Sequence, residues 1–171
     1  ASDVYKRQIY LLEQSNKPIK ISNNKSKIKF EMDSGVLISK VIDGRFPDYS
    51  KVIPKNNDKI LQIKLDEFRN SIERVSTVSS DRTKGLKMNI SKDAVQLSVN
   101  NPNSGEGIEN INAKFNSSDL NISFNSRYLT DIASQIENES IVISLKDPGS
   151  PVLIRDFSDK NSFHVVMPMK I

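Results

Sequence analysis

The chain of 171 residues contains no cysteine and a single histidine, His164. The absence of cysteine excludes disulfides, thiolate metal sites and cysteine nucleophiles. One histidine also makes a histidine-based metal cage or a Ser-His-Asp triad hard to assemble. We therefore expect no metal, no cofactor and no catalytic residue, and we interpret His164, which has no partner motif, as a structural or exposed side chain.

Long apolar runs are missing as well. No stretch of eighteen consecutive apolar residues occurs, and no basic segment followed by an apolar run opens the chain. The sequence thus indicates neither a membrane span nor secretion, and we expect a cytoplasmic protein. Lys and Arg exceed Asp and Glu by 25 to 21, which gives a charge of +4. This excess leaves nucleic acid or another acidic surface open as a partner without identifying one.

The segment 46–58, FPDYSKVIPKNND, divides the chain into two parts. It contains two prolines and a polar cluster, which is the composition expected of a linker between domains. Before it, alternating apolar residues in 27–32 and 36–42 predict strands from the back half of a domain. A second domain is expected to begin near Asn57.

Residues 59–170 contain one pattern twice. The first copy is a strand, a helix and three strands at 59–64, 65–80, 85–91, 94–100 and 107–115. The second copy has the same order at 120–125, 126–138, 140–146, 151–157 and 164–170. Such a duplication predicts a pseudo-symmetric α+β domain built from two βαβββ units. We expect two helices and ten strands of antiparallel sheet.

Each expected helix has one apolar face. Apolar residues fall at spacings of three and four, at Leu65, Phe68, Ile72, Val75 and Val78 and then at Leu129, Ile132, Ala133 and Ile136. We expect both helices to lie side by side on one side of the sheet, with Asn125 or Ser126 as the N-cap of the second. The outer faces carry Arg69, Arg74 and Arg127, which can bind phosphates without reading bases. A solvated face of mixed charge is the alternative.

The chain ends in the apolar segment FHVVMPMKI, 163–171. The alternation in this segment predicts a last strand that buries only part of it, and Pro168 stops that strand from continuing its ladder. An exposed apolar terminus costs solubility unless it binds something. We expect an exposed apolar groove here that receives a short partner peptide. The alternative is that the tail is only a core strand.

Four segments resemble the bacterial DNA polymerase sliding clamp, the beta subunit of DNA polymerase III. VIDGRFPDYSKVIP at 41–54 is similar to the family's junction between its second and third domains, and VVMPMK at 165–170 is similar to the ends of its chains. FNSRYLTDI at 124–132 and SPVLIRD at 150–156 are similar to the third domain. The resemblance covers about residues 9–171.

This resemblance implies a DNA-clamp fold and a domain division. Residues 9–56 correspond to the C-terminal half of the second clamp domain and the linker, and residues 57–171 correspond to the third domain. Residues 1–8, ASDVYKRQ, do not resemble the clamp, and we interpret them as a non-native leader.

The resemblance also implies a non-enzymatic processivity factor. Members of the family form a homodimer ring that encircles duplex DNA without sequence specificity. They tether the DNA polymerase catalytic subunit, the clamp loader and repair proteins through short peptide motifs. Their peptide groove corresponds here to residues of the junction, the second helix and the tail: Pro47, Lys51, Val52, Ile53, Asn125, Tyr128, Pro151, Val165, Val166, Met167, Pro168, Met169, Lys170 and Ile171.

Other positions follow from the same resemblance. The subunit interface corresponds to Thr77, Val78, Glu106 and Glu109, and DNA contact is assigned to the three arginines of the helix faces. Lys51 and Lys170 stand where the family commonly has arginine, and Ile171 stands where it has leucine. A lysine lacks the planar fork with which arginine binds a carboxylate or carbonyl.

A second class of function stays open on the residues alone, namely a small internally duplicated α+β ligand-binding domain or enzyme. An enzyme should show convergent polar groups in its main pocket. A clamp groove should instead be mainly apolar and built by the junction and the terminus.

Overall fold

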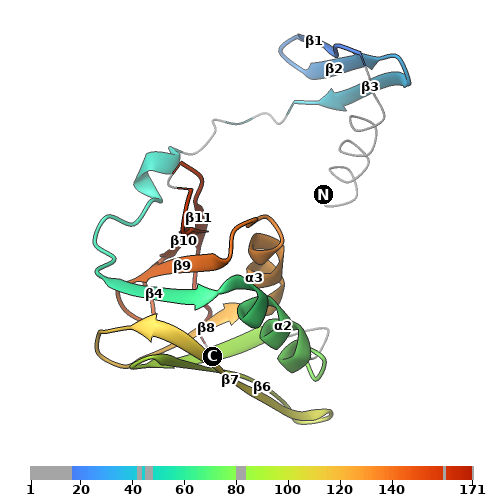
Figure 1. Cartoon of the computed structure of the whole chain (residues 1–171). Helices are drawn as coiled ribbons and strands as arrows, with labels where there is room; N and C mark the ends of the chain where they lie inside the picture. The colour runs from blue at the N-terminus through green and yellow to red at the C-terminus, as the bar shows by residue number, and fades with distance from the viewer. Residues whose placement is uncertain (1–16, 42–43, 45–47, 80–83, 160, 171) are drawn as a thin grey trace. The chain divides into compact units, whose positions relative to one another are not determined.

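The structure is a computed structural model that describes residues 17–41, 44, 48–79, 84–159 and 161–170 (Figure 1). The chain divides into two compact units, Ala1–Pro47 and Asp48–Ile171. This division falls inside the segment expected to be a linker. The interpretation of residues 1–8 as a leader concerns residues outside the described ranges. None of the helices in those ranges is long and apolar enough to span a bilayer.

The first unit contains a small antiparallel sheet. Its strands are β1 (Lys20–Asn23), β2 (Lys27–Met32) and β3 (Gly35–Lys40), in the order β1-β2-β3. The Asn24 side chain accepts hydrogen bonds from Ser26 N and Lys27 N and so closes the first turn. No residue of these three strands is fully buried, and Ile21, Val36 and Ile38 are exposed.

The second unit begins with a short 3-10 helix and continues as two βαβββ copies. The helix η1 covers Tyr49–Lys51. The first copy consists of β4 (Lys59–Lys64), α2 (Leu65–Ser76), β5 (Gly85–Ser91), β6 (Ala94–Asn101) and β7 (Gly105–Phe115). The second consists of β8 (Leu120–Asn125), α3 (Ser126–Ala133), β9 (Ser140–Leu145), β10 (Val152–Asp156) and β11 (His164–Val166). The predicted duplication is therefore confirmed.

These strands form one antiparallel sheet in the order β11-β10-β9-β4-β7-β6-β5-β8. The expectation of ten strands is wrong, because each βαβββ unit contains four strands and the described part of the second unit has eight. The two copies join where β4 pairs with β9 and where β5 pairs with β8. Within the first copy, β4 pairs with β7 over only three residues, Leu61–Ile63. Both copies contribute to one apolar core.

The helices α2 and α3 lie side by side on this sheet, as predicted (Figure 1). Their predicted apolar faces are buried, with Phe68, Ile72 and Leu129 fully enclosed. Both helices are shorter than the patterns 65–80 and 126–138 suggest. The hydroxyls of Thr77 and Ser134 each donate to the carbonyl three residues earlier, at 2.7 Å. This local bonding competes with continuation of the helix.

Candidate functional sites

The C-terminal segment is half core and half surface. Val166 ends β11, where it pairs with Val152 of β10, and it is only 6% exposed. The strand stops there, two residues before Pro168, and Met167 is 58% exposed. The interpretation of the tail as a core strand therefore holds for His164–Val166 and does not hold for the residues that follow.

Beyond Pro168 the tail crosses to the opposite end of the sheet. Met169 N donates a 2.7 Å hydrogen bond to Ser123 O on β8. Since β11 and β8 are the two terminal strands of the sheet, this bond ties both ends together. Asn125 lies two residues after Ser123, and its side chain caps α3 by accepting from Arg127 N at 3.0 Å. The N-cap predicted at Asn125 is confirmed.

Other predicted groove residues lie near this crossing. The β10–β11 register places Pro151 opposite Met167, just past the last paired residues. Tyr128, on the first turn of α3, is 56% exposed. The Asn57 side chain donates to Ser144 O at 2.8 Å and to Pro151 O at 3.0 Å. This anchor was missed by the sequence analysis, which used Asn57 only to mark a domain boundary.

The junction residues form a separate local structure. Asp48 caps η1 by accepting from Ser50 N and Ser50 Oγ, and Lys51 lies 3.9 Å from the Asp48 carboxylate. Val52 is exposed and Ile53 is half-buried. No hydrogen bond of the described residues joins Lys51, Val52 or Ile53 to the tail. Pro47 and Ile171, the two remaining groove positions, lie outside the described residues.

The three arginines predicted to contact DNA have different environments. Arg69 is half-buried and donates from Nη2 to Ala133 O at 2.7 Å, so it links α2 to the end of α3. Arg74 forms a two-pronged ion pair with Glu109 at 2.7 and 3.1 Å. Arg127 is exposed and lines a polar hollow of about 330 Å³ together with Lys84 and Asp131. Of the three arginines, only Arg127 has a guanidinium with no hydrogen bond to another group of the described residues.

The Arg74–Glu109 pair shifts both groups toward their charged forms. The hydrogen bond from Arg74 lowers the pKa of Glu109, and the same bond raises the pKa of Arg74. The pair spans from α2 to β7 across 35 residues of sequence, so it could not be predicted from local spacing. The pair also neutralises the positive charge of Arg74, one of the three arginines predicted to contact DNA.

Three of the four residues assigned to the subunit interface lie near the end of α2. A Cβ atom at Gly107 would lie 3.1 Å from Val75 O and 3.2 Å from the Val78 side chain, so β7 and this helix end approach closely. Glu106 and Glu109 flank Gly107 on β7, and Thr77 is exposed beside Val78. Glu109 shares the helix-side face of β7 with Gly107 and bonds to Arg74, whereas Glu106 lies on the opposite face of the strand. The structure therefore brings Thr77, Val78 and Glu109 together and leaves Glu106 on the other side of β7.

The strand β7 has a free edge next to this cluster. It pairs with β6 along its whole first part, from Gly105 to Asn112, but it pairs with β4 only from Ala113 to Phe115. Within the described residues, the β4 side of Gly105–Asn112 therefore has no partner strand. Ile108 on this segment is half exposed. An unpaired edge of this kind readily pairs with another chain.

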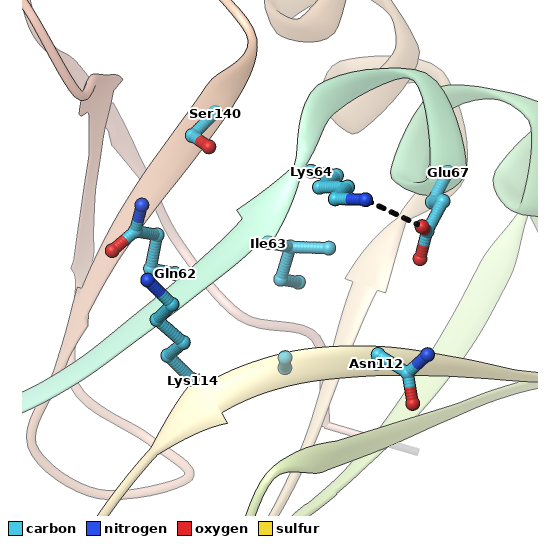
Figure 2. A pocket seen from close by; sticks show the side chains of 8 residues that line it. Gln62, Ile63, Lys64, Glu67, Asn112, Lys114 and Ser140 are labelled. Carbon is cyan, nitrogen blue, oxygen red and sulfur yellow. Dashed lines mark ion pairs between the residues drawn. The ribbon is translucent and has the colours of Figure 1, made fainter.

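A hollow of about 310 Å³ opens where β4 and β7 separate (Figure 2). Gln62 and Lys114 stand at one end, the Lys64–Glu67 ion pair at 3.7 Å stands at the other, and Ile63 lies between them. The polar groups of this hollow therefore do not converge. This arrangement lacks the feature that we expect of an enzyme pocket.

His164 lines a small hollow with Asp156, Asp159 and Glu137. Partial burial lowers the pKa of His164. The Asp156 carboxylate accepts hydrogen bonds from Asn138 N, Asn138 Nδ2 and Ser158 N. Burial is the largest single influence on the pKa of Asp156 and would raise it, but these hydrogen bonds together lower that pKa below its ordinary value. No cluster of three or more His, Asp or Glu in the described ranges is arranged to hold a metal ion.

Paired helices on one face of a curved sheet, with an internal βαβββ duplication, define the class of DNA clamps. The chain belongs to the DNA polymerase III beta subunit family, and residues 50–170 match the model of that family's C-terminal domain. A solved DnaN sliding clamp from Bartonella birtlesii, bound to griselimycin, has a TM-score of 0.88 at 39% identity and covers 98% of this chain and 45% of its own.

Curated relatives agree with the structural comparison. The beta sliding clamp of Caulobacter vibrioides is 34% identical over 161 residues, which cover 94% of this chain and 43% of the relative. The beta sliding clamp of Escherichia coli K12 is 29% identical over 161 residues and covers 94% of this chain and 44% of the relative. The chain therefore spans less than half the length of the curated relatives that it matches.

Proposed function

We propose that this chain is the C-terminal portion of a DNA sliding clamp, a non-enzymatic processivity factor that encircles duplex DNA in the cytoplasm. The observation that carries the proposal is the C-terminal segment. It is anchored in the core by Val166 and crosses to β8 with Met167 exposed beside Pro151. An apolar segment that is fixed by the fold and exposed at its tip suits a docking site.

The docking site takes short peptide segments of the DNA polymerase catalytic subunit, the clamp loader and repair proteins. Tyr128, Val52, Pro151 and Met167 supply apolar contact area, and methionines adapt to different ligands. Pro47 and Ile171 complete the set of groove residues that the family resemblance implies. A related clamp from Bartonella birtlesii binds griselimycin, and we infer that griselimycin occupies this groove.

Griselimycin titration tests the proposal. Met167→Ala and Tyr128→Ala should each weaken binding about tenfold or more, as apolar anchors of an interface do. Neither substitution should change the unfolding transition, since both side chains are more than half exposed. Phe157→Ala is the matched control, because Phe157 is 53% exposed at the far end of β10. Equal loss in the control, or no loss in the two groove variants, would contradict the groove assignment.

Contact with duplex DNA is electrostatic. Among Arg69, Arg74 and Arg127, we assign the direct phosphate contact to Arg127, with Lys84 beside it. Arg69 and Arg74 are held by Ala133 and Glu109 and contribute to the field of the helix face rather than to fixed contacts. In the assembled ring, Arg127→Ala should reduce the salt slope of DNA retention by close to one unit. An unchanged salt slope would show that Arg127 does not contact the DNA phosphates.

The second subunit of the homodimer ring pairs with the free edge of β7. Thr77 and Val78 flank that edge from the helix side, and Glu106 and Glu109 lie on the strand itself. The exposed Ile108 adds apolar area to the same surface. Ile108→Lys should therefore lower the fraction of dimer measured by sedimentation. An unchanged dimer fraction would contradict this assignment.

A further inference from the structure

A further hollow adjoins the tail on the outer side of β5 and β8. It has a volume of about 380 Å³ and is lined by Lys87, Asn121, Ser123, Met169, Lys170 and the turn Pro148–Gly149. We call it the basic hollow. Met169 and Lys170 belong to the predicted peptide groove, so the basic hollow is continuous with that groove along the tail.

Strand pairing sets the position of the two lysines. Lys87 of β5 is opposite Ser123 of β8, and Ser123 O accepts the hydrogen bond of Met169 N. Lys87, Ser123 and Met169 therefore form a row across the edge of the sheet, and Lys170 follows directly along the tail. Both lysines are exposed, and no carboxylate of the described residues forms an ion pair with either.

The nearest carboxylate in the turn is already occupied. Asp147 accepts hydrogen bonds from Gly149 N at 2.9 Å, from Ser150 N at 2.8 Å and from Ser150 Oγ at 2.7 Å. Both of its oxygens thus accept hydrogen bonds from its own loop, which contributes Pro148 and Gly149 to the lining of the basic hollow. The two ammonium groups remain available for an anionic group from outside.

We propose that the basic hollow binds an acidic side chain of the partner peptide, next to the apolar residues that occupy the groove. This inference rests on the proposed docking function and adds a charge preference to it. Opposite charges across an interface steer encounter and fix the register of a bound peptide more than they add affinity. The partner peptide should therefore carry Asp or Glu beside its apolar anchor.

The absence of cysteine from the chain allows a direct test. Asn121→Cys places a single thiol on the wall of the basic hollow. This thiol is exchanged with the symmetric disulfides of acetyl-Cys-Glu-Glu-amide and acetyl-Cys-Gln-Gln-amide, each mixed disulfide releasing one peptide thiol, and the products are followed by intact mass. The acidic peptide should be favoured about twofold to fivefold, within the range for exposed ion pairs, and the preference should fall at high salt. Gly149→Cys, on the turn that also lines the hollow, gives a second attachment point if Asn121→Cys does not fold.

Charge variants identify the lysines that are responsible. Lys87→Gln and Lys170→Gln should each reduce the preference at least twofold, whereas Lys92→Gln changes the net charge equally from an exposed turn outside the hollow and should leave it unchanged. Equal exchange of the two peptides, or an equal effect of Lys92→Gln, would overturn the proposal. Griselimycin binding of the unsubstituted protein tests the docking site separately. If this protein fails to bind griselimycin while Asn121→Cys still prefers the acidic peptide, the docking site is refuted but the basic hollow is not.

Discussion

Gly107 is the point at which the end of α2 rests on β7, and its replacement tests how tightly the proposed subunit interface is built. An added Cβ would lie 3.1 Å from Val75 O, 3.2 Å from Val75 Cα and 3.2 Å from Val78 Cγ2. Two of these atoms belong to the backbone, so relief requires the helix end to move by a few tenths of an ångström. The only positive-φ glycines among the described residues are Gly35 and Gly105, so the effect at Gly107 is one of space rather than backbone conformation.

Two opposing effects set the size of the change. Overpacking a well-filled contact costs about 1–3 kcal/mol. Replacing glycine by alanine also restricts the unfolded chain, which stabilises the protein by about 0.4–1 kcal/mol. Gly107→Ala should therefore lower the free energy of unfolding by about 0.5–2 kcal/mol. With a urea dependence of about 2 kcal/mol per molar, the unfolding midpoint should fall by about 0.3–1 M.

Gly149→Ala is the matched control. Its added Cβ would meet nothing closer than Asp147 Oδ1 at 3.7 Å, and its φ is not in the left-handed region. This variant should be as stable as the wild type or up to about 1 kcal/mol more stable, because only the unfolded-state effect remains. Urea unfolding followed by circular dichroism measures both variants. A Gly107→Ala protein as stable as Gly149→Ala would refute the close approach of α2 and β7.

Three further outcomes follow from the contacts of single side chains. Val166→Ala should lower the free energy of unfolding by about 1.5–3 kcal/mol because Val166 is buried. Met167→Ala should change it by less than about 0.5 kcal/mol because Met167 is exposed. Similar values for the two variants would contradict the division of the tail into a buried part and an exposed part. Partial burial lowers the pKa of His164 from 6.5, so the unfolded state binds that proton more tightly and the free energy of unfolding should fall as pH drops below about 6.5. His164→Gln should lack this loss between pH 7.5 and 5, and an identical pH profile would refute it. Arg69→Ala should destabilise the domain by about 1 kcal/mol in thermal unfolding, because the hydrogen bond to Ala133 O is lost. An unchanged stability would contradict a structural role for Arg69.

Periodicity was sufficient to predict the strands, the helices and their duplication. The alternation of Leu61 and Ile63 and the spacing of Phe68 and Ile72 reflect burial on one face, which local sequence reports directly. The ends of the helices were placed too late. The Ser and Thr hydroxyls that end them also occur within helices, so their presence alone does not mark a boundary.

Contacts between distant segments could not be predicted in the same way. The Arg74–Glu109 pair and the Met169–Ser123 hydrogen bond depend on the register of strands and helices that are far apart in the chain. A signal existed for Gly107, since a glycine inside a strand often marks close backbone approach. From the sequence, Gly107 was expected only as the first residue of a strand. Lys84 was also passed over, because the hollow it shares with Arg127 forms only when β5 and α3 meet.

The two halves of the C-terminal segment depend on one another. Val166 holds β11 in the core through its pairing with Val152, and the Met169–Ser123 bond holds the other end of the exposed stretch on β8. Met167 and Pro168 are thus suspended between two fixed points rather than left free at a chain end. Such preorganisation lowers the entropy that a peptide must offset when it binds. A truncation meant to remove the docking surface must therefore begin at Met167, because removal of Val166 would also take away part of the core.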